Sequence, residues 1–139
     1  MLKYCAVAGL VLAMAAPAVA GPMPMDSLVQ VNGLDTVCTG IGETKDDPRW
    51  ASYPVRIEFS NGGAQYLSGA SVKVSHGGRS IAEFDCPGAW VLLKGSAGAY
   101  RVDASIDGST AKPENARFMM GSRGQKRIIL RFRDFQPNQ

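Results

Sequence analysis

Apolar and polar side chains alternate along several short stretches of this chain, with the two-residue period of a β-strand. The clearest examples are residues 53–60 and 100–106, in which every second position is apolar and the positions between are mostly polar. Because successive side chains of a strand point to opposite faces, each stretch buries one face and exposes the other. No window of the sequence has the longer period of an amphipathic helix. The pattern therefore predicts an all-β protein.

Turn-forming residues separate these stretches from other β-type runs. Residues 90–93 are apolar at every position, which is typical of a strand in the middle of a sheet. The pairs Asn61-Gly62 and Asp107-Gly108 favour tight turns, because they tolerate the positive φ angles that hairpins need. Short strands at this spacing predict an antiparallel β-sandwich of seven to eight strands, of the prealbumin or immunoglobulin type. The other runs are residues 70–75, 80–84 and 126–133, with an ambiguous run at 111–120 that contains Pro113.

The alternation also predicts which side chains form the core. In the first long strand, Val55, Ile57 and Phe59 are expected to face inward, and Arg56 and Glu58 to face water. The full set of expected inward-facing side chains is Val55, Ile57, Phe59, Val72, Val74, Trp90, Leu92, Tyr100, Val102, Ala104, Leu130 and Phe132.

The first 20 residues have the pattern of a secretory signal peptide. Lys3 precedes an apolar run over residues 6–16, and Ala18-Val19-Ala20 forms a small-residue cleavage site. The apolar run is too short for a typical membrane span, although an uncleaved anchor is the alternative. We therefore expect cleavage after Ala20 and a periplasmic or secreted protein with no transmembrane segment in its mature chain.

The mature chain is long enough for one core and too short for two comfortable domains. We divide it into an irregular N-terminal arm and loop (21–52), a β-sandwich domain (53–133) and a C-terminal tail (134–139). Within the arm, residues 28–31 could add an edge strand. The formal net charge of the full sequence, +3, is too small to favour nucleic acid, so no nucleic-acid partner is expected.

Two cysteines, Cys38 and Cys86, remain after removal of the signal peptide. In an exported protein an even pair predicts a disulfide, which would contribute on the order of 4 kcal/mol by constraining the unfolded chain. A metal or redox site is the alternative, but the sequence has no C-x-x-C motif and only one histidine.

A glycine and valine pattern covers the centre of the chain. It consists of Gly69-Ala70-Ser71-Val72-Lys73-Val74, Gly88-Ala89-Trp90-Val91-Leu92-Leu93 and Gly98-Ala99-Tyr100-Arg101-Val102-Asp103-Ala104-Ser105-Ile106-Asp107-Gly108. This pattern resembles the carboxypeptidase regulatory-like domains, which are prealbumin-like sandwiches, and a group of uncharacterised exported bacterial proteins that carry this module almost alone. The resemblance implies a non-catalytic accessory or binding module. The chain departs from the family at residues 82–88, where a T-x-T-D-x-x-G run is more typical.

Enzymatic chemistry has little support in the sequence. Transthyretin-like hydrolases, which share the prealbumin fold, use several histidines, an arginine and a C-terminal Tyr-Arg-Gly-Ser motif. This chain has one histidine, His76, beside two glycines in an expected turn where a catalytic base would be solvated. We expect no enzyme; a small hydrolase of transthyretin-like fold with an unrecognised site is the alternative.

No cofactor or metal site is expected either. The acidic residues Glu43, Asp46 and Asp47 lack the spacing of a calcium loop. A copper site would need His76 with methionines for which the sequence indicates no mutual proximity, namely Met23, Met25, Met119 and Met120.

The binding residues that we expect are three arginines near the C-terminus, Arg127, Arg131 and Arg133. Strand alternation places them on one exposed face, where they could meet an anionic lipid, an anionic glycan or an acidic envelope protein. The alternative is that they protect an edge strand against pairing with other chains. A sugar-stacking platform that includes Trp50 and Tyr66 is a weaker hypothesis. The sequence thus predicts an exported β-sandwich that binds or scaffolds an envelope component.

Overall fold

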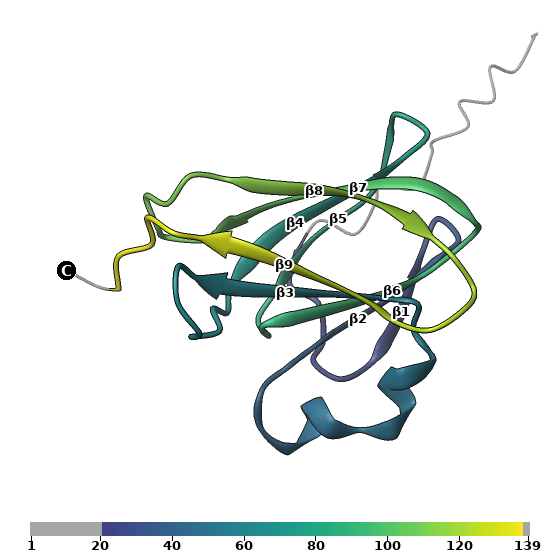
Figure 1. The fold of residues 1–139 in the computed structure, drawn as a ribbon, viewed down its shortest axis with the longest axis horizontal. Helices are drawn as coiled ribbons and strands as arrows, with labels where there is room; N and C mark the ends of the chain where they lie inside the picture. Colours follow the sequence, from purple (N-terminus) through teal and green to yellow (C-terminus); the bar gives the residue numbers. More distant parts are fainter. Residues whose placement is uncertain (1–20, 138–139) are drawn as a thin grey trace, which may run out of the picture.

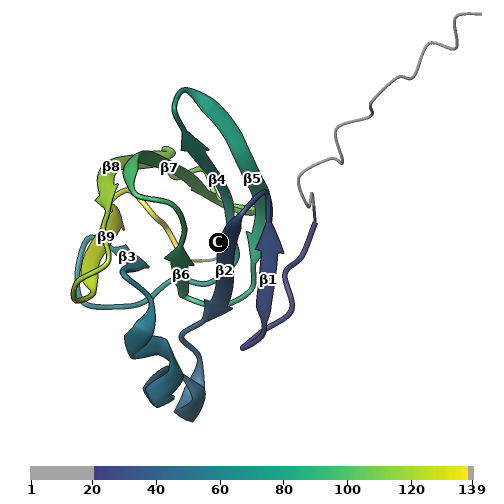
Figure 2. The same cartoon turned by 90° about the vertical axis from the view of Figure 1, so that its right-hand side faces the viewer.

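Two β-sheets face each other in the computed structural model, which describes residues 21–137 (Figures 1 and 2). One sheet has five strands in the order β1-β2-β6-β3-β9, and the other has four in the order β5-β4-β7-β8. This arrangement confirms the predicted all-β sandwich. The nine strands within the described residues are β1 (Leu28–Val31), β2 (Leu34–Thr39), β3 (Val55–Asn61), β4 (Ala70–His76), β5 (Arg79–Cys86), β6 (Trp90–Lys94), β7 (Gly98–Ile106), β8 (Glu114–Met120) and β9 (Lys126–Phe132).

The N-terminal arm is more ordered than we predicted. It supplies β1 and β2, which raise the number of strands above the expected seven to eight. In β2, Val37 and Cys38 point to opposite faces and both are fully buried, so the run has no polar alternation to mark it as a strand. Two short 3₁₀ helices follow, η1 (Gly42–Asp46) and η2 (Pro48–Ser52), and neither could span a membrane. The predicted signal peptide lies outside the described residues.

The strand β3 has different partners from those that its flanking turn suggested. It pairs antiparallel with β6 and parallel with β9, and no ladder joins it to β4. Neither Gly62 nor Gly63 has a positive φ. Instead the Asn61 side-chain oxygen accepts a hydrogen bond from the Gly63 N–H at 2.8 Å, and the chain crosses to the other sheet. A parallel pair needs a long connection, which explains why a local turn signal could not predict it.

The strand β6 is central, as its apolar sequence predicted, but its faces are the reverse of our expectation. Val91 and Leu93 belong to the core between the sheets, whereas Leu92 packs with Val37 and Trp50 in a separate outer cluster. Trp90 also lies on the outer face, beneath an arginine side chain. Both predicted residues are buried, but the prediction that they face inward is wrong. A run that is apolar on both faces contains no information about which face points inward.

The remaining predicted core positions are confirmed. Phe59 and Phe132 come from β3 and β9, are both fully buried, and meet residues of the four-stranded sheet in one continuous cluster. Tyr100 is also buried, and its ring stacks on Phe118 with the centroids 5.6 Å apart. In the strands with alternating apolar and polar residues, the predicted apolar positions therefore face the core.

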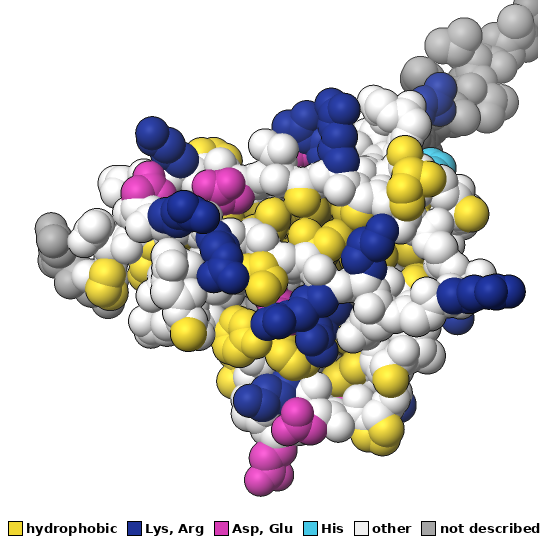
Figure 3. All heavy atoms as spheres, in the orientation of Figure 1, with side chains coloured by type: hydrophobic (Ala, Val, Ile, Leu, Met, Phe, Trp, Pro, Cys, Tyr) yellow, Lys and Arg dark blue, Asp and Glu magenta, His cyan; other side chains and the backbone are white. Residues whose placement is uncertain are grey.

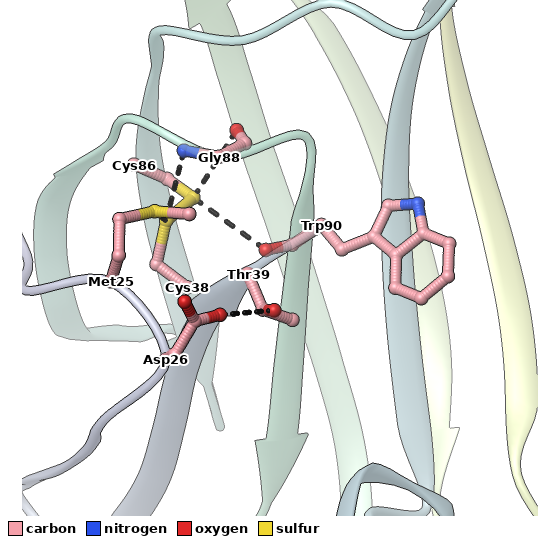
Figure 4. Close-up of a disulfide and its surroundings, with 7 residues drawn as sticks. All are labelled: Met25, Asp26, Cys38, Thr39, Cys86, Gly88 and Trp90. Carbon is pink, nitrogen blue, oxygen red and sulfur yellow. Dashed lines mark hydrogen bonds between the residues drawn. A yellow bond between two sulfur atoms is a disulfide. The ribbon is translucent and has the colours of Figure 1, made fainter. Parts of the chain in front are cut away.

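The predicted disulfide is present and joins the two sheets. Cys38 lies in β2 and Cys86 at the end of β5, with their Cα atoms 5.6 Å apart and a sequence separation of 48. The Gly88 N–H donates to the Cys38 sulfur at 3.2 Å, and the Met25 sulfur lies 3.6 Å away (Figure 4). The bond is fully buried, as both cysteines have no exposed surface.

We expect Phe132→Ala to lower the free energy of unfolding by about 3–5 kcal/mol, because it opens a large cavity between the sheets. The matched control is Met119→Ala on β8, since the Met119 side chain is 58% exposed and its truncation should change stability by less than about 0.5 kcal/mol. Urea unfolding of the mature protein measures both values. Equal stability of the two variants would contradict the assigned faces of β9.

We expect the double change Cys38→Ser and Cys86→Ser to lower the free energy of unfolding by about 2–5 kcal/mol, because a long loop is no longer closed in the unfolded chain. Reduction of the wild-type protein should have a similar effect, and reductant should not alter the double variant. A thiol assay on the denatured mature protein provides the check. Two free thiols without reductant would rule out the bond.

Candidate functional site

The predicted arginine row lies on the outer face of the five-stranded sheet. Arg127 and Arg131 project from β9 on the side opposite the buried Leu130 and Phe132, and Arg133 follows directly after the strand. The strand β9 is at the edge of its sheet. Arg127 and Arg131 therefore point outward, Arg133 is exposed just beyond the strand, and the edge position is compatible with both roles considered from the sequence.

Arg127 is bound to a carboxylate that we expected to face water. Glu58 of β3 has no exposed surface, and Arg127 donates from Nη2 to its Oε1 at 2.9 Å and from Nε to its Oε2. Arg56 approaches the same carboxylate from the other side, with its Nε 3.0 Å from Oε2. The prediction that Glu58 is solvent-exposed is wrong, because two arginine side chains and the neighbouring loop cover it.

The register of β3 and β9 explains why this carboxylate is needed. Arg56 and Arg127 are paired residues in the parallel ladder, so two guanidinium groups lie side by side on one face. Like charges at neighbouring positions repel each other, and Glu58 neutralises part of that repulsion. The three side chains form a group that we call the Glu58 cluster.

Burial and charge act on Glu58 in opposite directions. Burial alone would raise the pKa of Glu58, but the Arg127 hydrogen bonds, a contribution from the Tyr66 hydroxyl and the charge of Arg56 together lower it below the usual 4.5. The same carboxylate raises the pKa of Arg127. Glu58 is therefore ionised at neutral pH, and Arg127, which remains half exposed, carries a charge that is already partly neutralised.

Aromatic rings extend the cluster toward the centre of the sheet. The Arg56 guanidinium lies over the Trp90 ring at 4.4 Å from its centroid, and Tyr66 meets Trp90 edge to face with the centroids 6.0 Å apart. Tyr66 is 42% exposed, whereas Trp50 is buried in the outer cluster beneath η2. Of the two aromatic residues named for a sugar-stacking platform, Tyr66 is exposed and Trp50 is not.

A shallow hollow of about 470 Å³ lies beside the Glu58 cluster. It opens on the exposed side of β9, and Figure 3 shows basic and hydrophobic side chains side by side across this face of the molecule. Arg131 enters the hollow and makes one long hydrogen bond, 3.4 Å, to the Gly63 carbonyl oxygen. The residues that line the hollow are Glu58, Ser60, Gly62, Gly63, Ala64, Tyr66, Arg127, Ile129 and Arg131.

The charges of the Glu58 cluster and the neighbouring arginines do not balance. Within the described part of the chain, neither Arg131 nor Arg133 forms an ion pair with a carboxylate. The four guanidinium groups of Arg56, Arg127, Arg131 and Arg133 against the one carboxylate of Glu58 leave a net charge of +3. The sequence identified three of these arginines and named Tyr66 for a different site. It missed Arg56 and Glu58, because only the tertiary pairing of β3 with β9 brings them to the row.

The other candidates from the sequence are accounted for by structural contacts. His76 is half-buried at the end of β4, and its ring contacts that of Tyr100 in a tilted arrangement with the centroids 4.1 Å apart, so it is not the freely exposed turn residue that we expected. Asp47 caps η2 and binds Arg49, with Nη2 2.7 Å from Oδ2. Among residues 21–137, no group of three or more His, Cys, Asp and Glu residues could hold a metal ion.

The methionines considered for a copper site are also distributed among different environments. Met23 and Met120 are buried in the core, Met25 lies beside the disulfide, and Met119 points outward from β8.

Comparisons of the chain with protein-family models, with curated proteins and with solved structures found no match.

We expect Glu58→Gln to destabilise the fold at neutral pH by about 1–3 kcal/mol, because it removes the charged partner of two arginines. Since the folded pKa of Glu58 is lowered, its contribution is fully present above the ordinary value of 4.5 and is lost as the pH falls through the folded pKa. The stability difference between wild type and variant should therefore shrink on acidification from pH 7 to about pH 3.

The matched control is Glu43→Gln, which removes one carboxylate from the exposed surface of η1. Chemical unfolding at a series of pH values measures both variants against wild type. A Glu58→Gln penalty that stays constant down to pH 3 would show that the carboxylate charge does not stabilise the cluster.

Proposed function

We propose that this chain is a non-catalytic, exported binding module that holds an anionic component of the bacterial envelope on the outer face of its five-stranded sheet. The observation that supports this proposal is the excess of three positive charges in the group that Arg56, Arg127, Arg131 and Arg133 form with Glu58. Glu58 compensates one guanidinium, and Arg131 and Arg133 have no carboxylate partner within residues 21–137. An anionic partner would supply the missing negative charge.

The chemistry of the face indicates how such a partner would bind. Arg131 and Arg133 lie on either side of the loop after β3, with Arg131 bonded to the Gly63 carbonyl and Arg133 packed near Gly62. Guanidinium groups offer paired donors to carboxylate or phosphate oxygens, and the exposed ring of Tyr66 offers an apolar surface beside them. A lipid head group or an acidic glycan would satisfy both features.

The family resemblance is compatible with this proposal. A carboxypeptidase regulatory-like domain would present binding surfaces on a rigid sandwich without a catalytic centre. The disulfide agrees with folding in an oxidising compartment, which is where the predicted signal peptide would deliver the chain. Export and family membership are parts of the proposal and require their own tests, by mass spectrometry of the N-terminus and by an experimental structure.

The edge position of β9 supports a second role for the same arginines. A row of charges on an edge strand prevents intermolecular strand pairing, so the row could protect the protein against aggregation and bind nothing. The two roles predict opposite consequences of removing the charges. They can therefore be separated by one variant measured in two assays.

We expect the double change Arg131→Gln and Arg133→Gln to weaken binding to anionic vesicles about thirtyfold, because each basic residue near such a surface contributes about 1 kcal/mol. The variant keeps Arg127, since loss of Arg127 would expose the buried Glu58 and confuse binding with stability. Vesicles of phosphatidylglycerol and phosphatidylcholine, and an immobilised uronic-acid glycan, are the probes. Wild-type retention should also fall as salt rises from 0.1 to 1 M.

The control is Lys45→Gln, which removes one positive charge from the exposed surface of η1. Retention of the double variant at the wild-type level on both probes, together with new aggregation, would favour edge protection and overturn the binding proposal. Loss of binding of the double variant to the vesicles or the glycan, while the variant stays monomeric, would support the binding proposal.

A further inference from the structure

Three basic side chains converge on the outer face of the other sheet. Lys73 of β4, Arg101 of β7 and Arg117 of β8 come from three adjacent strands and line one open hollow of about 660 Å³. Figure 3 shows a group of Lys and Arg side chains at the upper rim of the molecule, on the side of the four-stranded sheet. This group lies on the opposite layer of the sandwich from the Glu58 cluster, so it is a separate surface.

The register places two of these cations directly opposite each other. Arg101 of β7 pairs with Arg117 of β8, and both side chains are on the outer face because their neighbours Tyr100 and Phe118 are buried. Like charges at directly opposite positions of an antiparallel pair are destabilising. The sheet therefore tolerates a repulsive pair at this point.

Among residues 21–137, only one of the three cations has a carboxylate partner. Arg101 binds Asp103 on its own strand, with Nε 3.1 Å and Nη2 2.9 Å from the Asp103 oxygens. Within the described residues neither Lys73 nor Arg117 forms an ion pair, although Lys73 has Glu83 and Asp103 as its cross-strand neighbours. The three cations and the one carboxylate that line the hollow leave a net charge of +2.

The surroundings of the hollow leave space for a small ligand. Ser75 adds a hydroxyl to its lining, and the Gly77-Gly78 turn bounds one end without side chains. A Cβ at either glycine would meet nothing within 4 Å, so the turn does not close the hollow. The Asp103 carboxylate holds the Arg101 fork in place, and Nη1 makes no hydrogen bond with the described residues.

We propose that Lys73, Arg101 and Arg117 form a binding site for a tetrahedral oxyanion of the phosphate class. A phosphate group would accept hydrogen bonds from two guanidinium groups and one ammonium group, and its charge would relieve the Arg101–Arg117 repulsion. Free phosphate and the phosphate group of a lipid present the same oxygens to this site. The site is independent of the arginine row on β9 and extends the proposed function to a second face.

The first experiment uses the mature protein with sodium phosphate at pH 7, against sodium chloride of equal ionic strength. Phosphate should raise the melting temperature in a saturable manner and should shift the NMR signals of the Arg101 and Arg117 side-chain N–H groups. Arg117→Gln should raise the phosphate concentration needed for half-saturation about tenfold, since the variant lacks charged hydrogen bonds to phosphate. Lys45→Gln, which makes the same charge change on the other side of the sandwich, should behave as wild type.

A second readout separates a binding site from a general effect of charge. In chloride alone, Arg117→Gln should melt at a higher temperature than wild type, because the like-charge pair is gone. Arg117→Lys keeps the repulsion and loses the paired donors, so it should lack the gain in chloride and bind phosphate more weakly. Vesicles that contain phosphatidic acid, tested on the Arg131→Gln and Arg133→Gln background, distinguish a lipid phosphate from the free ion.

Two results would overturn the proposal. One is a phosphate effect that does not saturate and is equal in wild type, Arg117→Gln and Lys45→Gln. The other is an Arg117→Gln protein that is less stable than wild type in chloride and binds phosphate with unchanged affinity. Phosphate binding without vesicle binding would assign the site to the free ion, and binding of both would assign it to a phosphate group on a lipid.

Discussion

The Cys38–Cys86 disulfide is the constraint on which one side of the sandwich depends. The strands β2 and β5 belong to different sheets, so no hydrogen-bond ladder joins them, and the disulfide is the covalent link between them. The segment before β1 is attached to both strands, because the Met23 N–H donates to Asp85 and the Asp26 N–H donates to Cys38. These bonds fix the segment before β1 against both sheets, and its Met23 side chain is buried in the core.

The position of β2 determines what the outer face of the five-stranded sheet can carry. β2 pairs with β6, β6 with β3, and β3 with β9, so each strand fixes the register of the next. The 3₁₀ helices cover one part of this face through Trp50, and the part over β3 and β9 stays open to solvent beside Tyr66. A polar group such as Glu58 is buried there because Arg127 supplies its hydrogen bonds and Arg56 a second positive charge.

The two sheets deal with paired arginines in different ways. On β3 and β9, Arg56 and Arg127 share one fully buried carboxylate, so this pair is mainly structural. The neighbouring Arg131 and Arg133 form no ion pair within residues 21–137. On β7 and β8, the Asp103 carboxylate binds Arg101 alone, and Arg117 has no ion-pair partner among the described residues. The first arrangement stabilises the fold, and the second leaves a charge that a ligand can neutralise.

The sequence by itself determined the features that depend on local periodicity and on residue type. Alternation in β3, β7 and β9 predicted strands and their buried faces, and the two cysteines outside the predicted signal peptide predicted the disulfide. These predictions succeed because a side chain in a strand can point to only one of two faces. In addition, two thiols in an oxidising compartment usually form a disulfide.

The tertiary structure decided everything that depends on partners distant in sequence. The parallel pairing of β3 with β9 buried Glu58 and converted Arg127 from a free binding residue into a member of an ion-pair cluster. The contact with Trp50 decided which face of β6 is outer, and the register of β7 with β8 placed Arg101 opposite Arg117. Such pairings depend on how whole sheets assemble and pack, so a local pattern of apolar and polar residues cannot predict them.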